Sequence, residues 1–113
     1  MYNEFLADRL RRLLKEKKIT FSEKQMMGGL AFMVNDKMCV GINGDKLMAR
    51  IHPDKYAEAL EKKGAREMDF TGRPMRGWVF VEPEGIDTEH QLDHWVQLAL
   101  DYNPLAKSSK NRK

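Results

Sequence analysis

Apolar and polar residues alternate along the chain with two different periods, and the change of period separates helices from strands. Apolar residues between positions 4 and 17 recur at helical spacing after Asn3, a good N-cap, and predict an amphipathic first helix. Between positions 28 and 51 the period is two, which predicts three strands joined as an antiparallel meander. The turns are expected at Asn35-Asp36-Lys37 and at Asn43-Gly44, whose residue types accept positive φ.

The second half of the chain begins with another helix and continues with strands. Residues 52–63 predict a helix, because Pro53 suits the first helical position and Gly64 suits a left-handed stop. Residues 65–69 are expected to form a short edge strand, and residues 78–81 an apolar strand. The two strands extend the antiparallel sheet.

A last helix completes the predicted fold. Thr88, with Gln91 three residues later, is a capping-box signature, and Asn103-Pro104 ends the helix. The element order is then α-β-β-β-α-β-β-α. It predicts a two-layer α+β fold, in which an antiparallel sheet of about five strands carries its helices mainly on one face. We expect a single domain over residues 1–106, followed by a flexible basic tail over residues 107–113.

Composition is that of a soluble intracellular domain. Of the 113 residues, 42% are hydrophobic and 33% are charged, which is typical of a folded domain rather than a disordered chain. The only cysteine, Cys39, has no disulfide partner within the chain and suits the cytoplasm. No secretion signal or membrane-spanning run is present, so we expect no membrane contact. A net charge of +3 does not by itself indicate a nucleic-acid partner.

Candidate catalytic and metal-binding residues are few. His90 and His94 stand four residues apart on the predicted last helix, a spacing that suits two metal ligands, but protein zinc sites need three or four. Cys39 lies in the middle of a predicted strand without a cysteine-enzyme motif, so a structural thiol is favoured over a nucleophile. We therefore expect no metal site, no cofactor and no enzymatic activity.

The densest polar cluster is expected around the turn before residues 78–81. Arginine side chains suit carboxylates or phosphates, and a tryptophan ring can stack on a planar ligand. A salt bridge from Asp69 to a neighbouring arginine explains the same residues without a ligand, and this structural interpretation is the favoured one. The candidate ligand-binding residues are Arg50, Asp69, Arg73, Arg76 and Trp78.

Three short motifs resemble the N-terminal domain of the TfoX competence-regulator family. They are Met26-Met27-Gly28-Gly29-Leu30-Ala31-Phe32, then Gly44-Asp45-Lys46-Leu47-Met48-Ala49-Arg50, and then Met68-Asp69-Phe70-Thr71-Gly72-Arg73-Pro74-Met75-Arg76-Gly77-Trp78. The resemblance implies a two-layer fold similar to type III secretion chaperones, in a bacterial cytoplasmic protein. It also implies regulation, since some relatives activate DNA-uptake genes through other transcription factors. It supplies no catalytic residues.

Two functional hypotheses follow. The leading one is a stand-alone, non-enzymatic regulatory or interaction domain that binds a protein partner or a second copy through its sheet or first helix. Met33, Met48 and Cys39 are expected on the sheet face away from the helices, where a dimer partner would cover them. The alternative is a binder of a small anionic ligand or nucleic acid that uses Arg50 and Trp78, with Arg73 and Arg76.

Overall fold

Six antiparallel strands form one sheet in the order β1-β2-β3-β4-β6-β5. The computed structural model describes residues 2–26, 28–68 and 76–106. The strands are β1 Ser22–Met26, β2 Gly29–Val34, β3 Lys37–Asn43, β4 Lys46–Arg50, β5 Ala65–Glu67 and β6 Trp78–Val81. The helices are α1 Glu4–Glu16, α2 Tyr56–Ala59 and α3 Glu89–Tyr102, with 3-10 turns η1 Pro53–Lys55, η2 Pro83–Gly85 and η3 Asn103–Leu105.

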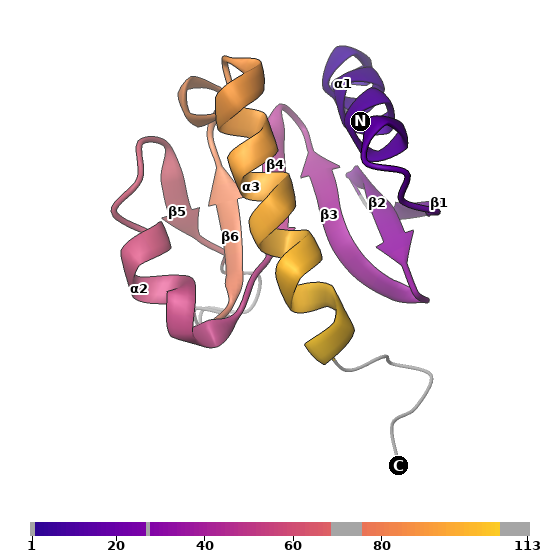
Figure 1. Ribbon diagram of the computed structural model, residues 1–113. Helices are drawn as coiled ribbons and strands as arrows, with labels where there is room; N and C mark the ends of the chain where they lie inside the picture. Colours follow the sequence, from indigo (N-terminus) through magenta and orange to yellow (C-terminus); the bar gives the residue numbers. More distant parts are fainter. Residues whose placement is uncertain (1, 27, 69–75, 107–113) are drawn as a thin grey trace.

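Helices α1 and α3 cover one face of this sheet, and the short α2 lies beside strands β5 and β6 (Figure 1). The predicted two-layer α+β architecture is therefore confirmed. The core between the layers consists of the apolar stripes of α1 and α3 and of alternate residues from the strands. Its largest fully buried side chains include Trp95, Phe32, Leu10, Leu14, Ile42 and Leu92.

Helices α1 and α3 begin at the capping residues that the sequence predicts. The Asn3 side chain accepts hydrogen bonds from the backbone amides of Phe5 and Leu6, at 2.9 and 3.1 Å, and so satisfies two donors that have no partner within the helix. Thr88 and Gln91 form the predicted capping box at the start of α3. Both helices consequently begin at capped residues.

The two predicted hairpin turns are also confirmed. Asn35 and Asp36, between β2 and β3, have φ values of 56° and 63°, which is the conformation of a two-residue turn that matches strand twist. Gly44, between β3 and β4, has a φ of 62°. These turns fix the register of the central hairpins, so they also fix which side chains share a face.

Strand β1 and helix α2 differ from the prediction. Strand β1 was not expected, because all five of its residues are exposed and no apolar alternation marks it. It is held by its ladder to β2. The expected helix over residues 52–63 is limited to the η1 turn and the four residues of α2, since residues 61–63 are charged and exposed and bury nothing that would extend it.

Cys39 lies on the helix-covered face, which corrects its expected position beside Met33 and Met48. The ladder between β2 and β3 shifts after Phe32, which pairs with Val40, whereas Met33 pairs with Met38. Cys39 is therefore the extra residue of a β-bulge, and it joins the core beneath the helices with 1% of its surface exposed. Simple alternation fails at this point because the bulge gives β3 one residue more than the facing part of β2.

Asn103, the only buried polar residue in the described part of the chain, ties the end of α3 to the β2–β3 turn. Its side-chain oxygen accepts a hydrogen bond from the Asn35 amide at 2.8 Å, and its own amide donates to the carbonyl of Val34 at 3.1 Å. The Lys37 ammonium donates to the carbonyl of Asn103 at 3.0 Å. One side chain thus joins residues about 70 positions apart.

Replacement of Asn103 by alanine is expected to lower the free energy of unfolding by about 1–3 kcal/mol, because the buried hydrogen bond from the Asn103 amide to the Val34 carbonyl is lost. Urea unfolding followed by circular dichroism measures the change. Gln97→Ala, an exposed change on the same helix, serves as the control and should have a much smaller effect. Equal stability of the two variants would contradict the role given to Asn103.

Replacement of Gly29 by alanine is expected to destabilise the protein by about 1–3 kcal/mol, because the new methyl group would overlap the backbone carbonyl of Ile42. The matched control is Gly44→Ala, where the new methyl group meets no atom within 4 Å and the change carries only the backbone strain of its positive φ. Thermal unfolding compares the two. A larger loss for Gly44→Ala than for Gly29→Ala would refute the close strand packing.

Candidate functional site

The sheet face turned away from α1 and α3, called the open face below, has no described helix packed on it (Figure 1). Successive residues of a strand point to opposite faces, so the register assigns each side chain to one face. Its ladder positions are Ser22, Lys24, Met26, Gly29, Ala31, Met33, Met38, Gly41, Asn43, Lys46, Met48, Arg50, Arg66, Trp78 and Phe80. Methionines, aromatic rings and basic residues predominate in this set.

Small residues form the centre of the open face, and two methionines close over it. A methyl group added at Gly41 would lie 2.8 Å from the end carbon of Met48 and 2.9 Å from that of Met38. Met48 is 1% exposed and Ala31 is 3% exposed, whereas Met26, on the edge strand, is 40% exposed. The centre of the face is therefore buried, and its accessible thioether side chains are those of Met26, Met33 and Met38, which change rotamer easily.

Two basic side chains of the open face lie over aromatic rings. The guanidinium carbon of Arg50 is 5.1 Å from the ring centre of Trp78, its cross-strand partner, and 5.9 Å from that of Tyr102. The Lys46 ammonium is 5.8 Å from the ring centre of Phe80. Such contacts stabilise by about 0.5–1 kcal/mol at exposed sites and hold the cations in defined positions.

Charge is distributed unequally between the two faces of the sheet. Among the described ladder positions, no aspartate or glutamate belongs to the open face, whereas Glu23 and Glu67 belong to the helix-covered side. Glu23 pairs with Arg11 of α1 at 2.6 Å, and this ion pair lowers the pKa of the Glu23 carboxyl. Arg66 of the open face pairs with Glu82 at 3.0 Å. The open face is therefore basic at its described positions.

Part of the predicted ligand cluster is brought together. Arg50 and Trp78 are direct neighbours, as their placement at the ends of adjacent strands requires. Arg76 is exposed, two residues before β6. Asp69 and Arg73 lie outside the described residues, and the salt bridge expected between Asp69 and an arginine stays a prediction.

Lys24, Met38, Lys46 and Phe80 were missed as members of a possible site. Each occupies a position two residues from another member of the open face along its own strand, or directly across from one on a neighbouring strand. For Lys46 and Phe80 the signal is the period-two alternation, because they lie opposite the buried residues of their strands. That alternation does not reveal Lys24, whose strand has no apolar pattern, or Met38, which the bulge displaces. Sequence reasoning had assigned only Met33, Met48 and Cys39 to this face.

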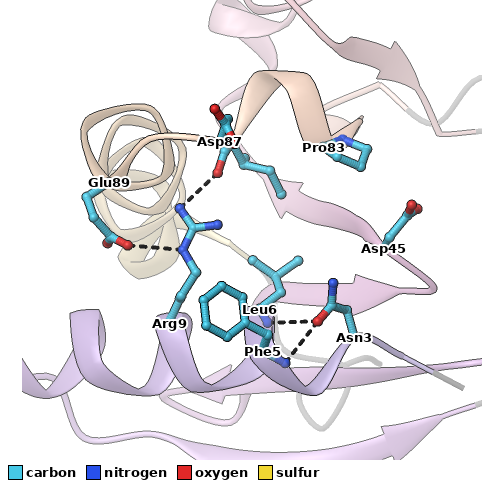
Figure 2. A pocket seen from close by; sticks show the side chains of 9 residues that line it. Asn3, Phe5, Leu6, Arg9, Asp45, Pro83, Asp87 and Glu89 are labelled. Atoms are coloured by element: carbon cyan, nitrogen blue, oxygen red, sulfur yellow. Dashed lines mark hydrogen bonds and ion pairs between the residues drawn. The ribbon is translucent and has the colours of Figure 1, made fainter.

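A second concave region lies between α1 and the start of α3, and Figure 2 shows the residues that line it. It is a shallow depression of about 460 Å³. Its one basic side chain, Arg9, donates to Glu89 at 3.0 Å and to the carbonyls of Ile86 and Thr88 at 2.8 and 3.3 Å. Arg9 is thus committed to joining α1 to α3, which leaves the exposed ring of Phe5 as the depression's apolar feature.

The titratable groups of the described residues do not converge on a reactive site. Among residues 2–26, 28–68 and 76–106, no group of three or more His, Cys, Asp or Glu side chains could hold a metal ion. Burial raises the pKa of the Cys39 thiol to about 12, so the thiolate needed for nucleophilic attack is absent near neutral pH. His94 packs edge-on against Trp95 and is not paired with His90.

These observations define a class: a small two-layer α+β domain with one sheet face closed by helices and the other basic and rich in methionine. The chain belongs to the TfoX N-terminal domain family, whose model matches residues 14–102. The family resemblance stated from the three sequence motifs is thereby confirmed. Neither a curated protein nor a solved structure matches the chain. Within the described residues, every helix is too short or too polar to cross a membrane.

His94 should make stability depend on pH. Burial, and then the nearby Lys62 and His90, lower the pKa of His94 below its ordinary value of 6.5. Between those two pKa values the unfolded chain binds more protons than the folded one, so stability falls as pH decreases through this range. Urea midpoints at neutral and mildly acidic pH measure the slope. His94→Leu should flatten it, and a slope identical to that of the parent protein would disprove the assignment.

Proposed function

We propose that this domain is a non-enzymatic regulatory module that binds another protein chain through its open face. The observation that carries the proposal is the chemistry of that face: adaptable methionines and aromatic rings, positioned cations, and no acidic residue at its described positions. A sheet that had only to close a core would need polar residues at the accessible positions of its outer side, not Met26, Met33 and Met38.

A protein-binding role also agrees with the rest of the chain. Cys39 is a buried thiol, and the first helix uses two of its three arginines for internal ion pairs, Arg9 with Glu89 and Arg11 with Glu23 and Asp8. These pairs support the sheet rather than the first helix as the binding surface. The regulatory part of the proposal rests on the family, because the resemblance implies regulators that act through other proteins.

The alternative, binding of a small anion or nucleic acid at Arg50 and Trp78, has weaker support. The Arg50 guanidinium already lies over the Trp78 ring, so that side of the ring is taken by the protein's own cation. A planar ligand would have to displace this contact before it could stack there. The remaining open-face aromatic ring, Phe80, has Lys46 in the same relation.

Site-specific photocrosslinking in cells tests the proposal. A photoreactive side chain at Met33 of the open face is expected to give a covalent adduct with another protein chain, identified by mass spectrometry. The same group at Glu61, an exposed residue after α2, is the control and should give none. Adducts from both positions in equal amount, or from neither, would count against the open face as the binding surface.

A further inference from the structure

The longest cross-strand row of the open face has a cation at each end and apolar residues between them. It runs Lys24, Ala31, Gly41, Met48, Phe80 and Arg66, one residue from each strand. Neighbouring strands are about 4.8 Å apart, so the row spans about 24 Å between its two basic ends. Its middle residues are buried, and the accessible apolar side chains lie in the adjacent rows, at Met26, Met33 and Met38. The row that begins at Met26 ends at Lys46, so basic residues border these methionines.

We infer that this surface takes an acidic segment of a partner protein that also carries apolar side chains. The inference rests on the proposed function and names the chemistry of the partner. Carboxylates would meet Lys24 and Lys46, and apolar side chains would pack on the accessible methionines Met26, Met33 and Met38. Charge complementarity selects this occupant, because every charged ladder position of the open face is basic, and Lys24 and Lys46 are the members used here, since Arg66 is paired with Glu82.

A second copy of this chain fits the surface poorly. Two open faces brought together would oppose basic residues with basic residues across a low-dielectric interface, which is unfavourable. Pairing of the edge strand β1 with β1 of a second copy would also bring basic residues together. An antiparallel register that pairs all five residues of β1 with those of a second copy places Lys24 directly against its own equivalent. A lysine at this position is a common protection of edge strands against self-association.

Nucleic acid is also disfavoured as the occupant. Proteins that bind single strands offer aromatic rings on which successive bases stack, together with a basic groove. Here the two open-face aromatic residues, Trp78 and Phe80, both belong to β6 and are both covered by cations of the protein itself. The accessible apolar side chains on β1, β2 and β3 are the methionines Met26, Met33 and Met38, which favour apolar protein side chains over bases.

Fluorescence anisotropy with the full chain and labelled peptides of equal length tests the inference. The probe is a peptide of alternating Asp and Leu, and the comparison probes are Asp-Ser and Lys-Leu peptides and an oligothymidylate. The Asp-Leu peptide is expected to bind the most tightly of the four. Its Kd should rise on going from low to physiological salt, because exposed charge pairs are screened.

The double variant Lys24→Glu, Lys46→Glu should raise the Kd for the Asp-Leu peptide by about tenfold. The matched control Arg12→Glu, Lys55→Glu makes the same change of net charge at exposed residues off the open face, and it should leave the Kd within about twofold. Both variants change only solvent-accessible side chains, and circular dichroism checks that each is folded.

Several results would overturn the inference. Equal binding of the Asp-Ser peptide would show that the partner needs no apolar side chains. Equal or tighter binding of the oligothymidylate would favour nucleic acid as the occupant. No binding of the Asp-Leu peptide, or an equal effect of the two double variants, would exclude the acidic partner. If Met33 nevertheless crosslinks to another chain in cells, the proposed interaction role stands and only the chemistry of the partner is wrong. If Met33 gives no adduct either, both proposals fail.

Discussion

The burial of one face of the sheet beneath α1 and α3 is the interaction on which the rest of the molecule depends. Trp95 of α3 and Leu10 of α1 enter a core with alternate residues of β2, β3 and β4. Polar contacts then hold α3 at both ends. Arg9 binds Glu89 and the carbonyl of Ile86 at the start of the helix, and Asn103, at its end, binds the carbonyl of Val34 beside the β2–β3 turn. Burial supplies most of the stabilisation, and these contacts fix the position of the helix on the sheet.

The same packing places the other half of the strand side chains on the open face, outside the core beneath the helices. A strand whose alternate residues are buried under helices has its remaining residues available for contacts outside the core. In β4 the two sets are Leu47 and Ala49 on one side and Lys46, Met48 and Arg50 on the other. The candidate site is therefore a property of the whole sheet rather than of a loop, and the strands hold its members in fixed register.

Features set by neighbouring residues were predictable, and features set by distant residues were not. The caps at Asn3 and Thr88 and the turn at Asn35 each act within a few residues, so the sequence shows them directly. Strand β1 has no apolar signal, because its backbone ladder to β2 and the ion pair of Glu23 with Arg11 require no apolar side chain. The bulge at Cys39 appears only when β2 is laid against β3. It places Cys39 on the helix-covered face and Met38 on the open face, which is the reverse of simple alternation from Val40.

The candidate site divides in the same way. Arg50 and Trp78 could be found because each ends a recognisable strand, whereas Lys24 could not, since its strand was missed. The charge of the open face depends on that unrecognised strand. Glu23 is directed toward α1 and pairs with Arg11, which leaves Lys24 on the open face. A slip of β1 by one residue would exchange these two charges and put an acidic group there. The ion pair between Arg11 and Glu23 forms only in the register that the ladder to β2 defines, and in that register the charge that β1 presents on the open face is positive.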